Sequence, residues 1–92
     1  MSTVVFISGH LKSFTGGVTE VALDSNSTSV GEALDSLWKL HPALRDRILD
    51  EQGEIRQHVN VFVGSDDVKR RDGLKTKLRS DEIHIFNAVS GG

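Results

Sequence analysis

The pattern of hydrophobic and polar residues predicts strands near both ends of the chain. Residues 3–8 form a short apolar run, and because four apolar residues are consecutive, we expect an inner strand that is covered on both faces. Residues 18–23 alternate in polarity, which is typical of a half-buried strand paired with the first. Residues 59–63 and 83–86 also alternate, and Val68 is expected to begin a short edge strand.

A helical period lies between the two pairs of strands. Ser29 precedes it and Glu32 follows three residues later, which matches a capping box. Apolar residues then recur at helical spacing from Val30 onward. Pro42 predicts the end of this helix, because the residue before a proline avoids the helical region. A shorter helical turn is expected over residues 43–49.

These elements predict an α+β fold. One amphipathic helix packed on one mixed sheet is the simplest way to bury both apolar stripes. Residues 1–87 are expected to form this domain, and residues 88–92 a flexible tail. Trp38 is expected in the core or at its rim. The predicted core consists of Val21, Val30, Leu34, Leu37, Val59, Val61, Val63, Leu74, Ile83 and Ile85.

The composition limits the chemistry that the chain can perform. Its 92 residues suit one domain, and the absence of cysteine removes disulfides, thiolate metal ligands and a cysteine nucleophile. A net charge of −2 gives no general attraction to nucleic acid, and no apolar run approaches the roughly 20 residues of a membrane span. Because no basic region precedes the first apolar run, we expect a cytoplasmic protein without a signal peptide.

Residues that could support catalysis do not form a known motif. The four histidines lack metal-ligand spacing, and no Gly-x-Ser-x-Gly elbow or phosphate-binding glycine loop is present. The acidic pairs in the chain lie in turn-like stretches, where solvated carboxylates are the better interpretation. We therefore expect no bound metal or cofactor and no enzymatic activity of the chain itself.

The glycine pair at the end of the sequence, Gly91 and Gly92, is its most informative feature. At average glycine usage, such a pair occurs at this position by chance in roughly one chain in two hundred. Glycine has no Cβ, so these residues can pass through a narrow channel. Six extended residues reach about 20 Å, which is enough to enter the active site of a partner. The Gly92 carboxylate is thus the predicted reactive group, and Gly91 gives it access.

Three features together resemble the β-grasp, ubiquitin-like sulfur carrier family. They are the strand over residues 59–63, the Asp72-Gly73-Leu74 step and the ending over residues 85–92. The resemblance covers nearly the whole chain. The family includes the molybdopterin synthase small subunit, the thiamin-pathway carrier and the mycobacterial cysteine-pathway carrier. It implies a mixed sheet with one main helix packed across it.

The resemblance also implies a reaction at Gly92. A ubiquitin-activating-type adenylyltransferase uses ATP to adenylate the carboxylate, and a sulfur donor protein converts the product to a thiocarboxylate. The sulfur then passes to an acceptor enzyme, such as a molybdopterin synthase large subunit or a cysteine-synthase-like protein, and the sequence does not indicate which pathway receives it. A ubiquitin-like modifier attached to lysine through Gly92 is the alternative, and a plain interaction domain is a third. The sequence does not separate carrier from modifier, because both need the same free diglycine end.

Phe62 and Phe86 are candidate docking residues. Each lies on the strand face opposite its β-branched neighbours, so it either completes the core under a loop or forms an exposed apolar patch. Related carriers bind partners through this face of the sheet, which favours a docking role. Val89 is expected to join them. Asn87 stands where many family members have proline, and residues 79–82 replace a glycine-containing acidic turn.

A basic cluster follows the third predicted strand. A solvated loop is the preferred interpretation, and a docking patch for an acidic partner is the alternative. Nucleic acid is a weaker third, because no aromatic residue is interleaved. The cluster consists of Lys69, Arg70, Arg71, Lys75, Lys77 and Arg79.

Overall fold

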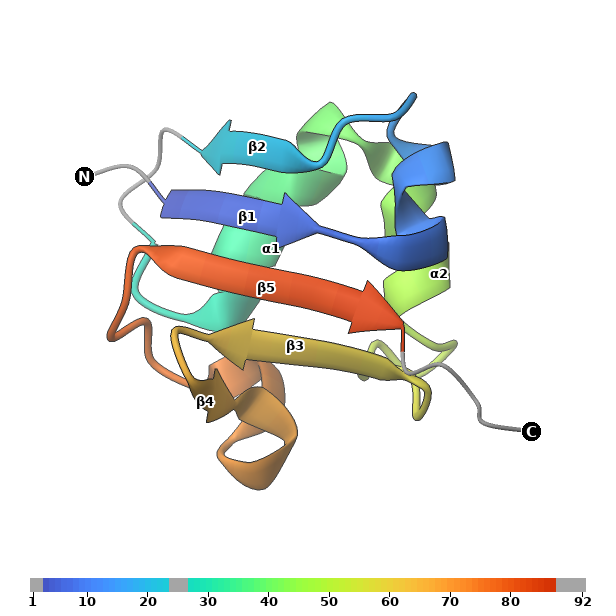
Figure 1. Cartoon of the computed structure of the whole chain (residues 1–92). Helices are drawn as coiled ribbons and strands as arrows, with labels where there is room; N and C mark the ends of the chain where they lie inside the picture. The colour runs from blue at the N-terminus through green and yellow to red at the C-terminus, as the bar shows by residue number, and fades with distance from the viewer. Residues whose placement is uncertain (1–2, 24–26, 88–92) are drawn as a thin grey trace.

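The computed structural model describes residues 3–23 and 27–87. A five-stranded sheet in the order β2-β1-β5-β3-β4 forms one layer, and α1 crosses one of its faces (Figure 1). The strands are β1 (Thr3–Ile7), β2 (Glu20–Leu23), β3 (Val59–Val63), β4 (Asp66–Asp67) and β5 (Glu82–Asn87). The helices are α1 (Val30–Leu40) and α2 (Arg45–Ile48), with 3₁₀ helices at Gly9–Phe14, Pro42–Leu44, Val68–Arg70 and Gly73–Lys75.

The sheet is mixed, which agrees with the prediction of one amphipathic helix packed on one mixed sheet. The two central strands, β1 and β5, are parallel, and every other neighbouring pair is antiparallel. The sequence prediction of an inner strand near the N-terminus is confirmed. The expectation that both its faces are covered is wrong. Val4 and Phe6 are only half-buried, because β2 and β5 flank β1 within the sheet while α1 covers one face (Figure 1).

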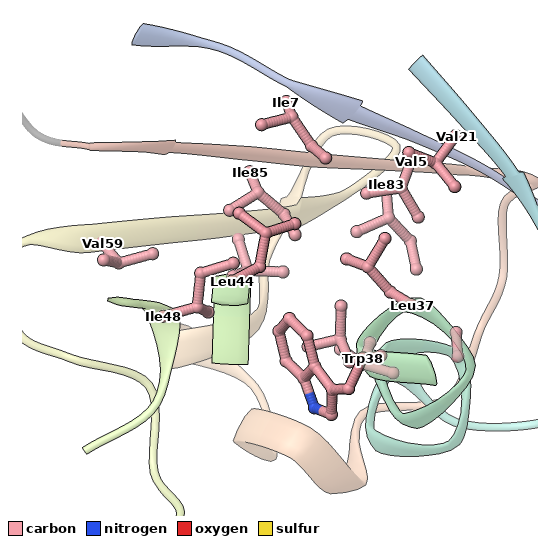
Figure 2. Packing of buried hydrophobic residues seen from close by; sticks show 14 of the residues in the cluster. Val5, Ile7, Val21, Leu37, Trp38, Leu44, Ile48, Val59, Ile83 and Ile85 are labelled. Atoms are coloured by element: carbon pink, nitrogen blue, oxygen red, sulfur yellow. The ribbon is translucent and has the colours of Figure 1, made fainter. Parts of the chain in front are cut away.

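The core lies between α1 and the covered face of the sheet. Figure 2 shows Leu37 of α1 facing Val5 and Ile83 of the strands, and the Trp38 ring on the side of Leu44 and Ile48. All of the predicted core residues are buried except Leu74, which is half-buried and packs against the cluster. The short helices add Leu11, Leu44, Ile48 and Val68 to the core.

The N-terminus of α1 is capped, although not by the box that the sequence predicts. Ser29 Oγ accepts a hydrogen bond from the backbone N–H of Glu32, with an N···O distance of 3.3 Å. The Glu32 carboxylate, however, accepts from the N–H of Thr28 (2.9 Å), one residue before the cap. In a standard capping box the Glu32 carboxylate would accept from the N–H of Ser29, so this second hydrogen bond is displaced by one residue. The helix ends at Leu40, just before Pro42 as predicted.

Ser29→Ala is expected to lower the free energy of unfolding by about 1 kcal/mol, because the N–H of Glu32 loses its acceptor. Urea unfolding monitored through Trp38 fluorescence measures the change. Ser36→Ala is the matched control inside α1, and it should not destabilise the protein because alanine favours helix interiors. Equal losses in the two variants would show that the cap contributes nothing specific.

The segment after β3 differs from its prediction. β4 contains only Asp66 and Asp67, and Val68 begins a 3₁₀ helix instead of a strand. Asp67 starts this helix because its carboxylate accepts a hydrogen bond from the N–H of Lys69 (3.0 Å). The turn carries the Val68 side chain into the core, where it is fully buried. In residues 3–23 and 27–87, no helix has the length and apolar character needed to cross a membrane.

Candidate docking face

The sheet face away from α1 gathers aromatic side chains from its three inner strands. Strand pairing places Phe6 of β1 opposite His84 of β5, and His84 opposite Phe62 of β3. Phe86 lies two residues after His84 and therefore on the same face, paired with Asn60. We call Phe6, Phe62, His84 and Phe86 the aromatic face.

The rings of the aromatic face lie in two stacked pairs. The centroids of Phe62 and Phe86 are 5.6 Å apart, and those of Phe6 and His84 are 4.7 Å apart. All four residues are half-buried, and they line a shallow hollow of about 370 Å³. Such stacking holds each ring in place, while the open side of the hollow leaves apolar surface in contact with solvent. Phe62 and Phe86 thus lie outside the core formed with α1.

His84 gives the aromatic face a polar centre. Its Nε2 lies 3.0 Å from Oε1 of Glu82, which is on the same side of β5. Both side chains are partly exposed, so water competes with this contact. The hollow therefore combines apolar rings with one imidazole that a partner can reach.

Sequence reasoning found Phe62 and Phe86 but missed Phe6 and His84. These two become neighbours only because β1 and β5 pair in parallel, with Phe6 opposite His84. The first and last strands of the chain lie far apart in sequence, so the alternation within each strand does not reveal this pairing. The only available signal was that both residues point away from the branched apolar side of their strands.

Strand β5 connects the aromatic face to the predicted reactive end. Asn87, the last residue of β5, directly follows Phe86 and pairs with Val59. Its Oδ1 is buried and accepts no hydrogen bond within the described part of the chain. Val89, Gly91 and Gly92 lie outside the described residues, so the roles predicted for them and the tail boundary stay predictions. Gly92 is six residues from Phe86, a span of about 20 Å at most.

Across residues 3–23 and 27–87, no group of three or more histidine, aspartate or glutamate residues could hold a metal ion. The acidic pair of Asp66 and Asp67 has local partners. Asp66 lies 3.3 Å from Arg71, and Asp67 caps the following 3₁₀ helix.

A mixed five-stranded sheet crossed by one helix is the architecture of ubiquitin-like β-grasp proteins. The sequence profile of the ThiS family matches residues 5–92, and the chain belongs to this family. The chain is similar to small archaeal modifier protein 1 of Haloferax volcanii, with 36% identity over 72 residues that cover 78% of each chain. It is also similar to the sulfur carrier protein CysO of Mycobacterium bovis, with 28% identity over the full length of both.

Solved structures agree with this assignment. The crystal structure of SAMP1 from Haloferax volcanii has a TM-score of 0.83 and 31% identity, and the alignment covers all of both chains. The crystal structure of the Amycolatopsis orientalis BexX/CysO complex contains a chain with a TM-score of 0.83 and 27% identity, covering 98% of this chain and 99% of that one. The ubiquitin-like β-grasp fold expected from the sequence is confirmed.

Proposed function

We propose that this protein is a sulfur carrier whose Gly92 carboxylate is adenylated by a ubiquitin-activating-type enzyme and then converted to a thiocarboxylate. The observation that carries the proposal is the continuity of β5, which joins Phe86 of the aromatic face to the residues leading to Gly92. When an enzyme binds this face, Gly92 can reach any point within about 20 Å of Phe86. Membership of the ThiS family and full-length similarity to CysO support a carrier role and not a catalytic one.

The proposed chemistry takes place at the main-chain carboxylate of Gly92. A carboxylate oxygen attacks the α-phosphorus of ATP, and pyrophosphate leaves. The resulting acyl-adenylate is an electrophile, because AMP is a good leaving group where oxide is not. Sulfur at the oxidation level of sulfide, delivered by a donor protein, attacks the acyl carbon and expels AMP. The chain has no cysteine to hold the acyl group, so the product is a terminal thiocarboxylate.

A modifier role is the second candidate, and the similarity to small archaeal modifier protein 1 favours it. Here a lysine amine of another protein attacks the same acyl-adenylate, and an isopeptide bond forms. Both roles require the adenylation step, so they separate only at the identity of the attacking nucleophile. Conjugates that appear without any thiocarboxylate would identify the modifier.

Pyrophosphate release tests the activation step. The purified adenylyltransferase should release pyrophosphate from ATP only when the chain is present, in an amount that follows the chain concentration. No release in the presence of the chain would favour the plain interaction domain over both carrier and modifier.

Phe86→Ala is expected to weaken binding to the activating enzyme by more than about 1 kcal/mol, a rise in Kd of at least about fivefold, because a ring is lost from the centre of the contact. Titration calorimetry measures Kd, and circular dichroism verifies the fold. Val18→Ala removes exposed apolar surface outside the sheet and is the matched control. Unchanged affinity, or an unfolded Phe86 variant, would refute the docking role.

We also propose that the aromatic face binds the acceptor enzyme after sulfur has been loaded. The BexX/CysO complex shows that a structurally similar CysO chain associates with a partner protein. A cysteine-synthase-like enzyme or a molybdopterin synthase large subunit is the class of acceptor that fits, since each accepts sulfur from a carboxy-terminal thiocarboxylate.

A further inference from the structure

The charge of this protein is divided very unevenly. Residues 69–79 hold six basic residues and one acidic residue, a net charge of +5. The rest of the chain holds five basic and twelve acidic residues, a net charge of −7, which gives the overall value of −2. Charges of both signs, interspersed along the loop, are enough to keep a loop soluble. This concentration of a single sign therefore needs a further explanation.

The basic segment is held in a defined conformation along the β4 edge of the sheet. Its first 3₁₀ helix is anchored by the buried Val68 and capped by Asp67. Its second, Gly73–Lys75, packs on α1 and is followed by Thr76, whose Oγ1 accepts a hydrogen bond from the N–H of Asp72 (3.1 Å). The positions of the basic side chains are thus set by the fold.

Most of these cations are unpaired within the described residues. Arg71 forms an ion pair with Asp66 at 3.3 Å, and Lys69 Nζ donates to the carbonyl oxygen of Gln57 at 2.8 Å. The other four are exposed and lie within 4.0 Å of no carboxylate that the structure describes. They are Arg70, Lys75, Lys77 and Arg79, which we call the basic edge.

The basic edge is continuous with the aromatic face. Phe62 forms a wall of the aromatic hollow and also of a second hollow, of about 400 Å³, that contains Arg70. A third hollow, of about 340 Å³, shares Asp66 and Arg71 with the second and reaches Lys75, Lys77 and Arg79. A partner bound over Phe62 therefore lies next to the hollow that contains Arg70, and through it next to the rest of the basic edge.

We propose that the basic edge is the second half of the docking surface and binds an acidic patch beside the apolar pocket of the activating enzyme. This inference rests on the proposed function. Opposite charges at the rim of an interface accelerate association and fix its register. A protein partner fits better than nucleic acid, because the rest of the chain carries a net charge of −7 and would repel a long polyanion that extends beyond the basic edge. The cluster also presents no aromatic ring for base stacking.

Association kinetics with the purified adenylyltransferase test the proposal. Arg70→Glu and Arg79→Glu should each lower the association rate constant by about two- to fivefold in low salt, with a weaker salt dependence. Lys39→Glu, on the exposed side of α1, makes the same change in net charge and should leave the rate constant unchanged. Neither Arg70 nor Arg79 forms an ion pair within the described residues, so both variants should melt with the unchanged protein. Lys39 lies in the last turn of α1, so its variant is compared at a temperature well below its own melting transition.

Three outcomes would overturn the proposal. Equal effects of all three variants would show that only net charge matters, and no effect of any would show that the basic edge is not at the interface. Binding of total tRNA that Arg70→Glu abolishes, with enzyme association unchanged, would assign the edge to RNA. In each of these cases the chain would still form a thiocarboxylate when the enzyme is saturating, so the proposed function would stand. A chain that is never activated would instead refute both the proposed function and the activating enzyme as the partner of the basic edge.

Discussion

Deleting Gly92 is expected to abolish thiocarboxylate formation while the melting temperature of the domain stays unchanged. The deletion makes Gly91 the last residue and moves the carboxylate back by one residue, about 3.5 Å. This shift is as large as the separation of about 3–3.5 Å at which atoms react, so the carboxylate no longer reaches the phosphorus. The described hydrogen bonds and the core lie within residues 3–87, so stability should not depend on Gly92. Intact mass after reaction with the activating enzyme, ATP and a sulfur donor measures the product.

A chain extended by one alanine after Gly92 is the matched variant. It keeps both glycines but displaces the carboxylate in the opposite direction and adds a Cβ beside it. Loss of product in both variants, with unchanged melting and unchanged binding through the aromatic face, would place the effect on the chemical step. Product from either variant would mean that the enzyme does not select the position of the carboxylate.

Leu37→Ala is expected to lower the free energy of unfolding by about 2–5 kcal/mol, because a buried leucine loses its transfer energy and leaves a cavity. Leu37 is fully buried and points from α1 toward the strands (Figure 2). A small domain has only about 5–15 kcal/mol of stability in total, so a large share would be lost. Urea unfolding followed by Trp38 fluorescence measures it.

Leu40→Ala in the same helix provides the control for that loss. Leu40 is 57% exposed at the end of α1, so removing its side chain should change stability by less than about 1 kcal/mol. If the two variants lost equal stability, burial of Leu37 in the core would not explain the result, because Leu40 is exposed. If Leu37→Ala cost only a few tenths of a kcal/mol, the packing described for α1 would be wrong.

The parts of the fold that were predictable are those with a long, regular period. α1 begins at the predicted residue, Val30, and β3 has both of its predicted ends, Val59 and Val63. Each of these elements buries one continuous apolar stripe, which its sequence pattern reveals. The 3₁₀ helix Gly9–Phe14 was not predicted. It packs only Leu11 and, in part, Phe14 against the core, and two apolar residues are too few to establish a period. Val68 was misassigned for the same reason, since its burial depends on the Asp67 cap.

The candidate site was predictable only in part. Phe62 and Phe86 could be placed on the open face, because alternation within one strand decides which side a residue occupies. The contact of Phe6 with His84, and the continuity between Phe62 and Arg70, depend on which strands become neighbours. That is a tertiary property, and local pattern does not specify it.

The absence of cysteine allows one direct measurement of the central claim, that sulfur is loaded onto Gly92. The unreacted chain has no thiol, so a maleimide reagent should not label it. After activation and sulfur loading, the reagent should label a single site. Trypsin cleaves after Arg79, the last basic residue, so residues 80–92 form one peptide that contains Gly92. We expect one label on this peptide, located on Gly92 by fragmentation and absent without ATP. A chain that remains unlabelled, a label on another peptide, or a lysine-linked conjugate as the only product would contradict it.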